Sequence, residues 1–556
     1  MYGLILVIAL LTPIGCSDVP RTPVIQTNSG PVQGVILTTV WESQEYSAFK
    51  GIPYATPPIG NLRFRPPVPP ESWNQTRDVI NDTNSCPQEG HGVYSGNEDC
   101  LYLNVYTPET TFKNITLKPV MVWIYGGSFL RGNASSSVYG PDFFMEQDVV
   151  IVTFNYRLGP LGFLYLNHTL APGNAAMYDQ VMVLEWVRDN IVAFGGDPNQ
   201  VTLFGQSAGS ASVTYHVLSE RSSGLFHQAI CQSGTLTPYF YRTHEEAFNN
   251  AKKLAAALDF HSDSPKELLE FYRQADPKDL MTKTNKIFSI FTDLSLPFTP
   301  VKDNPNLIDS NHKFLPECPI NIMTTQKFNK MPMIVGFTHD EMLDFTEGVY
   351  HTLNITIDLW ERIFPILPIE ILKLYDLVKT VSVDASDYIM KGPIDFTQRL
   401  YSQGDDGNPI YYYQLSYVSN YSMHKLDGIP VDGIAHYDDV GLLFNVQRLD
   451  APTDPEYPFN QMRQKIVTLW ANFAKYQNPT PDDANPLDVI WQPSNNSGRL
   501  LNITDNSQMI NRKQAISSGA LDTEKFLYLT MPITNDCKTV IYPNFFSIFS
   551  IQDLIS

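Results

Sequence analysis

VTLFGQSAG (residues 201–209) joins an apolar strand to a Gly-x-Ser-x-Gly turn, and the helix-capable run 210–218 follows it. Gly205 and Gly209 have no Cβ, so strand and helix can pack closely around a very sharp turn. Such a turn exposes the Ser207 hydroxyl at a helix N-terminus, where backbone amides and the helix dipole favour a negatively charged oxygen. The stretch therefore predicts a nucleophile elbow.

Strand and helix signals alternate on both sides of this elbow. Residues 119–124 are typical of an apolar strand, and the continuous apolar, β-branched run 149–154 indicates a buried parallel strand. Residues 181–194 have helical periodicity. Residues 245–258 and 265–274 are expected to form helices in insertions. No run in the 556 residues resembles a linker. We therefore expect one large α/β domain with a mostly parallel central sheet flanked by helices.

The formal net charge is −20 and the isoelectric point is about 4.9. A protein that binds nucleic acid needs clustered Lys and Arg to neutralise phosphates, and this surface would repel them. Nucleic acid is therefore excluded as a partner. The acidity instead favours solubility in an extracellular fluid.

Residues 1–17 are typical of a secretory signal peptide, because the apolar run 4–11 is too short to span a bilayer and small residues follow it. We expect a secreted mature domain over residues 18–556 without a membrane span. Asn-x-Ser/Thr sequons predict N-glycosylation in that pathway. They lie at Asn74, Asn81, Asn114, Asn133, Asn167, Asn354, Asn420, Asn495 and Asn502.

Six cysteines leave five if Cys16 is removed with the signal peptide. Cys86 and Cys100 are close enough in sequence to clip one surface loop in an oxidising compartment. The remaining three leave room for one further bridge and at least one thiol; they are Cys231, Cys318 and Cys537. Cys231 lies in the run 228–231, which is typical of a buried strand, and this predicts an inert core thiol. No His/Cys cluster has zinc spacing, so no metal and no cofactor are expected.

Further motifs appear before the elbow in a defined order, at residues 49–60, 97–106, 155–163, 173–180 and 194–198. Together with the elbow they resemble the type-B carboxylesterase/cholinesterase family of α/β-hydrolases, and insect secreted carboxylesterases most closely. The resemblance covers essentially the whole mature chain. It implies a Cys86–Cys100 disulfide and two structural ion pairs, Arg63–Glu98 and Arg157–Asp179.

The sequence YGGSF (residues 125–129) follows an apolar strand, and a glycine pair there lets backbone amides point at a ligand. An ordinary turn is the alternative that this local pattern leaves open. The resemblance implies an oxyanion hole made by the amides of Gly127, Ser128 and Ala208. Ser128 replaces the usual Gly or Ala, but a backbone donor needs no particular side chain.

A serine nucleophile needs an imidazole base oriented by a carboxylate, and in this fold the acid precedes the histidine in the chain. Asp340, Glu341 and Asp344 all follow the predicted strand 333–337, so local sequence leaves three acids in competition. The family spacing Gly-x-x-x-x-Glu selects Glu341. Met342 stands where the family usually has glycine.

Two histidines, His424 and His436, follow the predicted late strand 409–417. The family motif Gly-x-x-His-x-x-Asp/Glu selects His436 as the base. His216 and His339 are interpreted as bystanders. The predicted catalytic set is therefore Ser207, Glu341 and His436.

The resemblance implies hydrolysis of a small carboxylic ester through an acyl-enzyme on Ser207. The short loop between Cys86 and Cys100 has no Trp to bind choline, and Gln206 replaces the Glu common in cholinesterases, so choline esters are excluded. Juvenile hormone esterases share the elbow but usually continue with Ala where this chain has Ser210. A juvenile hormone or other specialised ester hydrolase is one alternative, and a non-catalytic adhesion protein of the same family is another.

An aromatic group could line an acyl pocket or belong to the core, and core is favoured; its members are Phe288, Phe291 and Phe298. The sequence is compatible with both a monomer and a homodimer.

Overall fold

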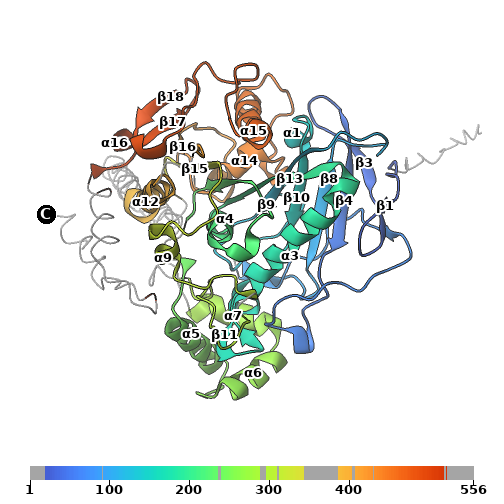
Figure 1. Cartoon of the computed structure of the whole chain (residues 1–556), viewed down its shortest axis with the longest axis vertical. Coiled ribbons are helices and arrows are strands. Elements are labelled where there is room, and N and C mark those ends of the chain that lie inside the picture. The colour runs from blue at the N-terminus through green and yellow to red at the C-terminus, as the bar shows by residue number, and fades with distance from the viewer. Residues whose placement is uncertain are drawn as a thin grey trace, which may run out of the picture.

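The computed structural model describes residues 19–90, 92–235, 240–287, 296–309, 312–343, 386–403, 407–429 and 431–518, together with residues 521 and 537. Its centre is an 11-stranded twisted sheet (Figure 1). In order across the sheet the strands are β18 (Gln508–Asn511), β17 (Arg499–Ile503), β16 (Ile410–Leu415), β15 (Met333–Thr338), β14 (Gln228–Gln232), β13 (Gly196–Gln206), β9 (Lys118–Ile124), β10 (Val150–Phe154), β8 (Tyr102–Thr107), β4 (Glu45–Pro53) and β3 (Val35–Thr38).

The sheet is parallel from β10 to β17 and antiparallel at both edges. Short turns join β3 to β4 and β17 to β18, and a short connection permits only antiparallel pairing. Neighbouring parallel strands need longer crossovers, which carry the helices. The expected mostly parallel sheet is confirmed.

Helices cover both faces of the sheet, as the side chains of β14 demonstrate. Successive residues of a strand point to opposite faces. Cys231 Sγ lies 3.7 Å from Thr214 Oγ1 in helix α4 (Ala208–Leu218), whereas Gln232 accepts a 3.0 Å hydrogen bond from Trp470 Nε1 in helix α15 (Pro458–Tyr476). Helices α4 and α15 therefore lie on opposite faces, and the three-layer α/β architecture is confirmed.

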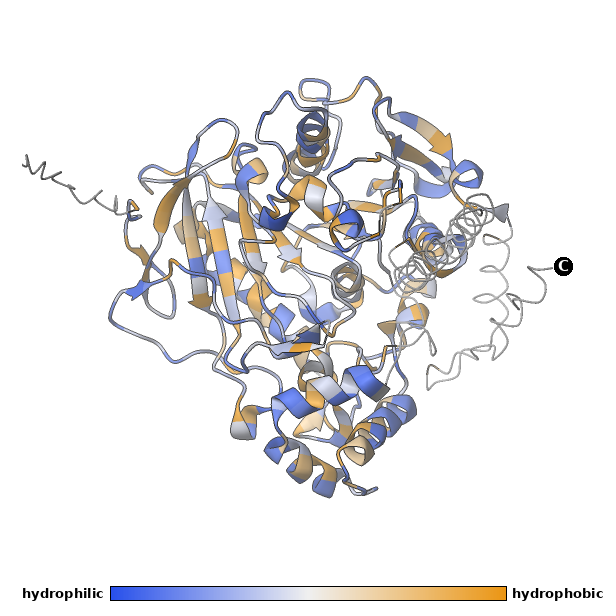
Figure 2. Cartoon of the chain, turned by 180° about the vertical axis from the view of Figure 1, so that it is seen from behind, coloured by the Kyte–Doolittle hydropathy of each residue, from blue (hydrophilic) through white to orange (hydrophobic). Residues whose placement is uncertain are grey.

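Three helices gather at one end of the molecule (Figure 1): α5 (His244–Ala257), α6 (Pro265–Gln274) and α7 (Pro277–Ile287). Thr243 and Glu246 form a reciprocal capping box at the start of α5, and the Ser264 side chain caps α6. Figure 2 shows hydrophilic and hydrophobic residues alternating around these helices, as amphipathic surface helices require. The two helices expected in this region are confirmed, with α5 beginning one residue earlier.

Further helices and three small sheets complete the described fold. The helices are α1 (Asp142–Met145), α2 (Gly159–Phe163), α3 (Ala175–Asn190), α9 (Pro319–Thr324), α12 (Gly392–Tyr401), α13 (Met423–Leu426), α14 (Val440–Leu443) and α16 (Arg512–Ala515), with a π-helical turn at Ser386–Lys391. Small sheets contain β1 (Ile25–Gln26), β2 (Pro31–Gln33) and β5 (Arg77–Asp78); β6 (Gln88–Gly90) and β7 (Val93–Ser95); and β11 (Tyr165–His168) and β12 (Ala171–Pro172).

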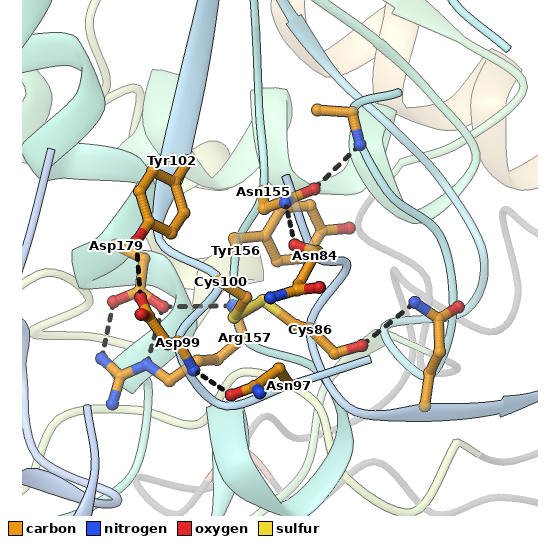
Figure 3. Close-up of a disulfide and its surroundings, with 12 residues drawn as sticks. Asn84, Cys86, Asn97, Asp99, Cys100, Tyr102, Asn155, Tyr156, Arg157 and Asp179 are labelled. Atoms are coloured by element: carbon orange, nitrogen blue, oxygen red, sulfur yellow. Dashed lines mark hydrogen bonds and ion pairs between the residues drawn. A yellow bond between two sulfur atoms is a disulfide. The ribbon is translucent and has the colours of Figure 1, made fainter. Parts of the chain in front are cut away.

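A disulfide and two ion pairs connect the loops at one end of the sheet. The Cys86–Cys100 disulfide lies beside the buried Arg157–Asp179 pair (Figure 3), whose Nη2–Oδ1 distance is 2.6 Å. Arg63 and Glu98 form the other ion pair implied by the family resemblance, at 2.5 Å. Both pairs are largely shielded from water, so removal of one partner would leave an uncompensated charge.

The other cysteines fall into a bridge and a thiol. Cys318 and Cys537 are disulfide-bonded, which settles the pairing that the sequence left open. Cys231 is free and buried, and burial raises the pKa of its thiol to about 12. The prediction of an inert core thiol is therefore consistent with its surroundings.

Phe298 is 2% exposed and belongs to the core, whereas Phe288 and Phe291 lie outside the described residues. The predicted signal peptide, residues 1–17, also lies outside them. Within the described ranges, no helix has the length and apolar character needed to cross a membrane.

Candidate active site

The elbow between β13 and α4 has a backbone that few residues adopt. Ser207 has φ 57° and ψ −125°, and its amide donates to the Gln232 carbonyl on the neighbouring strand at 2.9 Å. A Cβ on Gly209 would lie 2.0 Å from the Ile124 carbonyl oxygen, so only glycine lets α4 begin this close to β9. Sheet and helix together hold the serine in its strained turn.

The imidazole of His436 lies between the serine and a carboxylate. His436 Nε2 is 2.7 Å from Ser207 Oγ, and His436 Nδ1 is 2.5 Å from Glu341 Oε2. Because a carboxylate accepts only, Nδ1 carries the proton toward Glu341 and Nε2 is left to accept from the serine hydroxyl. The structure thus brings the three predicted catalytic residues together at the carboxyl ends of β13, β15 and β16, where ligands bind in open α/β sheets.

Glu341 is fixed before substrate arrives. Its side chain is 0% exposed, and its second oxygen accepts a 2.8 Å hydrogen bond from the Thr338 amide. Of the competing acids, Asp340 turns to the backbone of Ile434 instead, and Asp344 lies outside the described residues. The side chain of His436 is 15% exposed, so a substrate can approach the imidazole, whereas the Glu341 carboxylate is fully shielded from solvent.

The loop after β9 lies directly against the nucleophile. A Cβ on Gly126 would stand 2.9 Å from Ser207 Cβ. The next two residues turn through positive φ, 108° at Gly127 and 60° at Ser128. In the described part of the chain the amides of Gly127, Ser128 and Ala208 have no acceptor. Three free N–H groups beside a serine are what a developing oxyanion requires.

Sequence reasoning missed the role of Gln206, which was noted only as a departure from cholinesterases. Its Nε2 donates a 2.5 Å hydrogen bond to the His436 carbonyl. The residue before the nucleophile therefore holds the backbone of the base. The elbow motif leaves this position variable, so it carries no signal for the contact.

Sequence reasoning also missed a buried carboxylate behind the triad. Asp439 Oδ2 accepts from Gln232 Nε2 at 2.7 Å, and Gln232 in turn accepts from Trp470. Among the described residues, Asp439 Oδ1 has no hydrogen-bond partner. Burial above all, and then the negative charge of Glu341, raise the Asp439 pKa to about 7, although the Gln232 hydrogen bond opposes the shift. The only signal was the acidic position that ends the histidine motif.

Three other histidines, His216, His424 and His339, have partners of their own. His216 is buried in α4 between Ser222 and Gln180, and burial lowers its pKa to about 3. His424 Nδ1 is 2.6 Å from Asp438 Oδ2. His339 is 45% exposed and pairs with Asp340. None of these contacts involves Ser207 or Glu341, and the interpretation of His216 and His339 as bystanders stays a prediction.

The sheet topology and the serine–histidine–glutamate geometry are those of an α/β-hydrolase. The model of the carboxylesterase family matches residues 21–518. Juvenile hormone esterase of Tribolium castaneum is 33% identical over 509 residues, covering 84% of this chain and 85% of its own length. Venom carboxylesterase-6 of Apis mellifera is 32% identical over 513 residues, covering 84% and 87%.

A solved structure is similar to this chain as well. Juvenile hormone esterase from Manduca sexta, with OTFP covalently attached, superimposes with a TM-score of 0.77 at 27% identity, covering 91% of this chain and 99% of that one. The chain belongs to the carboxylesterase family. Its enzyme class is accordingly that of a serine carboxylic ester hydrolase.

The raised pKa of Asp439 predicts that the free energy of unfolding depends on pH. The folded pKa of about 7 exceeds the ordinary 3.8, so the folded state binds this proton more tightly than the unfolded chain. The associated stabilisation is complete below about pH 4 and is lost as pH rises through 7. Asp439→Asn keeps an acceptor for Gln232 and removes the titration. We expect the variant to gain stability over the parent between pH 5 and pH 8, by on the order of a few kcal/mol.

Urea unfolding of both proteins at pH 5 and pH 8 measures this difference. Asp189→Asn, at an exposed ion pair, is the matched control and should differ from the parent by the same small amount at both pH values. A stability difference for Asp439→Asn that is independent of pH would contradict the assignment.

Proposed function

We propose that the chain hydrolyses carboxylic esters through an acyl-enzyme on Ser207. His436 removes the hydroxyl proton as Ser207 Oγ attacks the ester carbonyl, and Glu341 stabilises the resulting imidazolium. The amides of Gly127, Ser128 and Ala208 bind the tetrahedral oxyanion. The imidazolium then returns its proton to the leaving alcohol.

Water completes the cycle by the same steps. His436 takes a proton from the water as it attacks the acyl carbonyl, the second tetrahedral intermediate collapses, and Ser207 recovers its proton as the carboxylic acid leaves. The observation that carries this proposal is the pair of contacts on one imidazole, 2.7 Å to Ser207 Oγ and 2.5 Å to buried Glu341. A chain with an adhesion role alone has no need of this geometry, and the relatives named above are esterases.

A juvenile hormone ester is a second candidate substrate. It is favoured because a curated relative and a solved structure, from two insects, are both juvenile hormone esterases. Both matches span more than four-fifths of this chain. Exclusion of choline esters stays a prediction, based on the missing Trp and on Gln206.

We also propose that residues 1–17 are a signal peptide and that residues 18–556 form the secreted enzyme. Two disulfides support an oxidising compartment. Of the sequon asparagines, Asn133 and Asn502 are half-buried and Asn354 lies outside the described residues. The others are exposed and accessible to a glycosyltransferase; they are Asn74, Asn81, Asn114, Asn167, Asn420 and Asn495.

Secretion is tested by expressing the full chain in insect cells. We expect enzyme in the culture medium, an N-terminus that begins after residue 17, and a mass that falls when N-glycans are removed enzymatically. Protein retained inside the cells with an intact N-terminus would overturn the signal-peptide proposal without bearing on the catalytic one.

The catalytic proposal is tested by burst titration with p-nitrophenyl acetate and butyrate. We expect one equivalent of p-nitrophenol per enzyme followed by turnover, and a loss of at least about 10⁴-fold in kcat for Ser207→Ala. Ser222→Ala is the matched control, because Ser222 is another buried serine 2.8 Å from a histidine nitrogen, His216 Nδ1. It should retain the burst. Undiminished turnover in Ser207→Ala would refute the mechanism.

Substrate preference is tested by comparing kcat/KM for juvenile hormone with that for p-nitrophenyl butyrate. Preference for the hormone, together with OTFP that attaches to the parent protein but not to Ser207→Ala by mass spectrometry, supports the specialised role. Turnover of p-nitrophenyl esters without measurable hormone hydrolysis identifies a general carboxylesterase instead.

A further inference from the structure

The loop that carries the catalytic acid is bonded to the loop that carries the base. The Asp340 amide donates to the Ile434 carbonyl at 3.1 Å, and the Ile434 amide donates back to Asp340 Oδ2 at 3.1 Å. Asp340 directly precedes Glu341, and Ile434 lies two residues before His436. This two-way contact, here called the Asp340 clamp, therefore joins two of the three catalytic loops at their catalytic ends.

A second carboxylate holds the next amide of the same loop. Asp438 Oδ2 accepts from the Ala435 amide at 2.6 Å and also pairs with His424 Nδ1. Asp438 belongs to the loop of His436 itself, so this contact shapes the loop but does not locate it against the acid. Only the Asp340 clamp, among these two, sets the distance between the two loops.

The Asp340 side chain is built for this contact. It is 8% exposed, and its other oxygen, Oδ1, is 2.9 Å from His339 Nδ1. Burial alone would raise the Asp340 pKa, but the hydrogen bond and charge of His339, with smaller contributions from the Ile434 amide and Lys391, leave the pKa lowered. The carboxylate is therefore ionised over the neutral pH range, and an anionic acceptor makes a stronger hydrogen bond than a neutral one.

We propose that Asp340 is a positioning residue of the esterase reaction, which acts through the Ile434 backbone to hold the His436 imidazole between Glu341 and Ser207. The proposal rests on the function proposed above. Both imidazole contacts are short, so a shift of the base toward one partner lengthens the contact with the other. Misplacement of a catalytic group by about 1 Å costs about 100-fold in rate.

The test compares two substitutions at this position. Asp340→Ala removes the acceptor, and we expect kcat for p-nitrophenyl butyrate to fall about 10- to 100-fold with KM within about twofold of the parent. Asp340→Asn keeps an oxygen acceptor for the Ile434 amide, and we expect kcat within about threefold of the parent. Rates are divided by the burst amplitude, so that inactive protein does not contribute.

Asp303→Ala is the matched control for a structural effect. Asp303 is a buried carboxylate that accepts from the amides of Phe314 and Leu315, at 2.6 and 2.7 Å. We expect lower thermal stability and an unchanged kcat per active site. If Asp340→Ala behaves like this control, Asp340 is merely structural and the proposal is overturned. It is also overturned if Asp340→Asn is as slow as Asp340→Ala, because the acceptor is then irrelevant.

Gly433→Ala disturbs the Asp340 clamp but leaves the Asp340 carboxylate in place. This variant tests the positioning role of Asp340 if Asp340→Ala does not fold. The added Cβ would lie 2.9 Å from Asp340 Oδ2 and 2.8 Å from a flexible Leu343 methyl. We expect a fall in kcat of about tenfold at unchanged KM, whereas the parental kcat would overturn the proposal. A parent enzyme without a burst would refute the function proposed above, a result separate from any difference between variants.

Discussion

The His436 imidazole imposes the constraint on which the rest of the site depends. One ring must accept from Ser207 at one nitrogen and donate to Glu341 at the other, and its two nitrogens are a fixed distance apart. Three loops from three strands must therefore meet with little tolerance. Contacts between the loops place them against one another, and contacts within the His436 loop fix its shape.

The parallel sheet is the first means by which the three catalytic loops are positioned. Strand periodicity sends Cys231 to the α4 face and Gln232 to the α15 face, so one strand anchors both helical layers. The same Gln232 binds the Ser207 amide with its carbonyl and Asp439 with its side chain. A single strand residue thus ties the elbow to the helix that follows His436.

Buried carboxylates are the second means by which the catalytic loops are positioned. The hydrogen-bond partners of each carboxylate determine its role and its pKa. Asp340 and Asp438 each satisfy backbone amides of the His436 loop. Asp439 is buried, and one of its oxygens has no hydrogen-bond partner in the part of the chain that the structure describes, so burial raises its pKa. Acidic residues that are adjacent in sequence therefore have different electrostatic roles, because they face different neighbours.

Local sequence determined the class of fold and the chemistry of the nucleophile. Strand–turn–helix patterning and the elbow glycines depend on residues a few positions apart, and the family spacing selected Glu341 and His436. Tertiary structure alone decided which groups support them: the Gln206 contact with His436, the Asp340 clamp, the Cys318–Cys537 pairing and the burial of Asp439. These contacts join residues up to 230 positions apart. Their formation depends on how strands and loops meet in space, which no local pattern encodes.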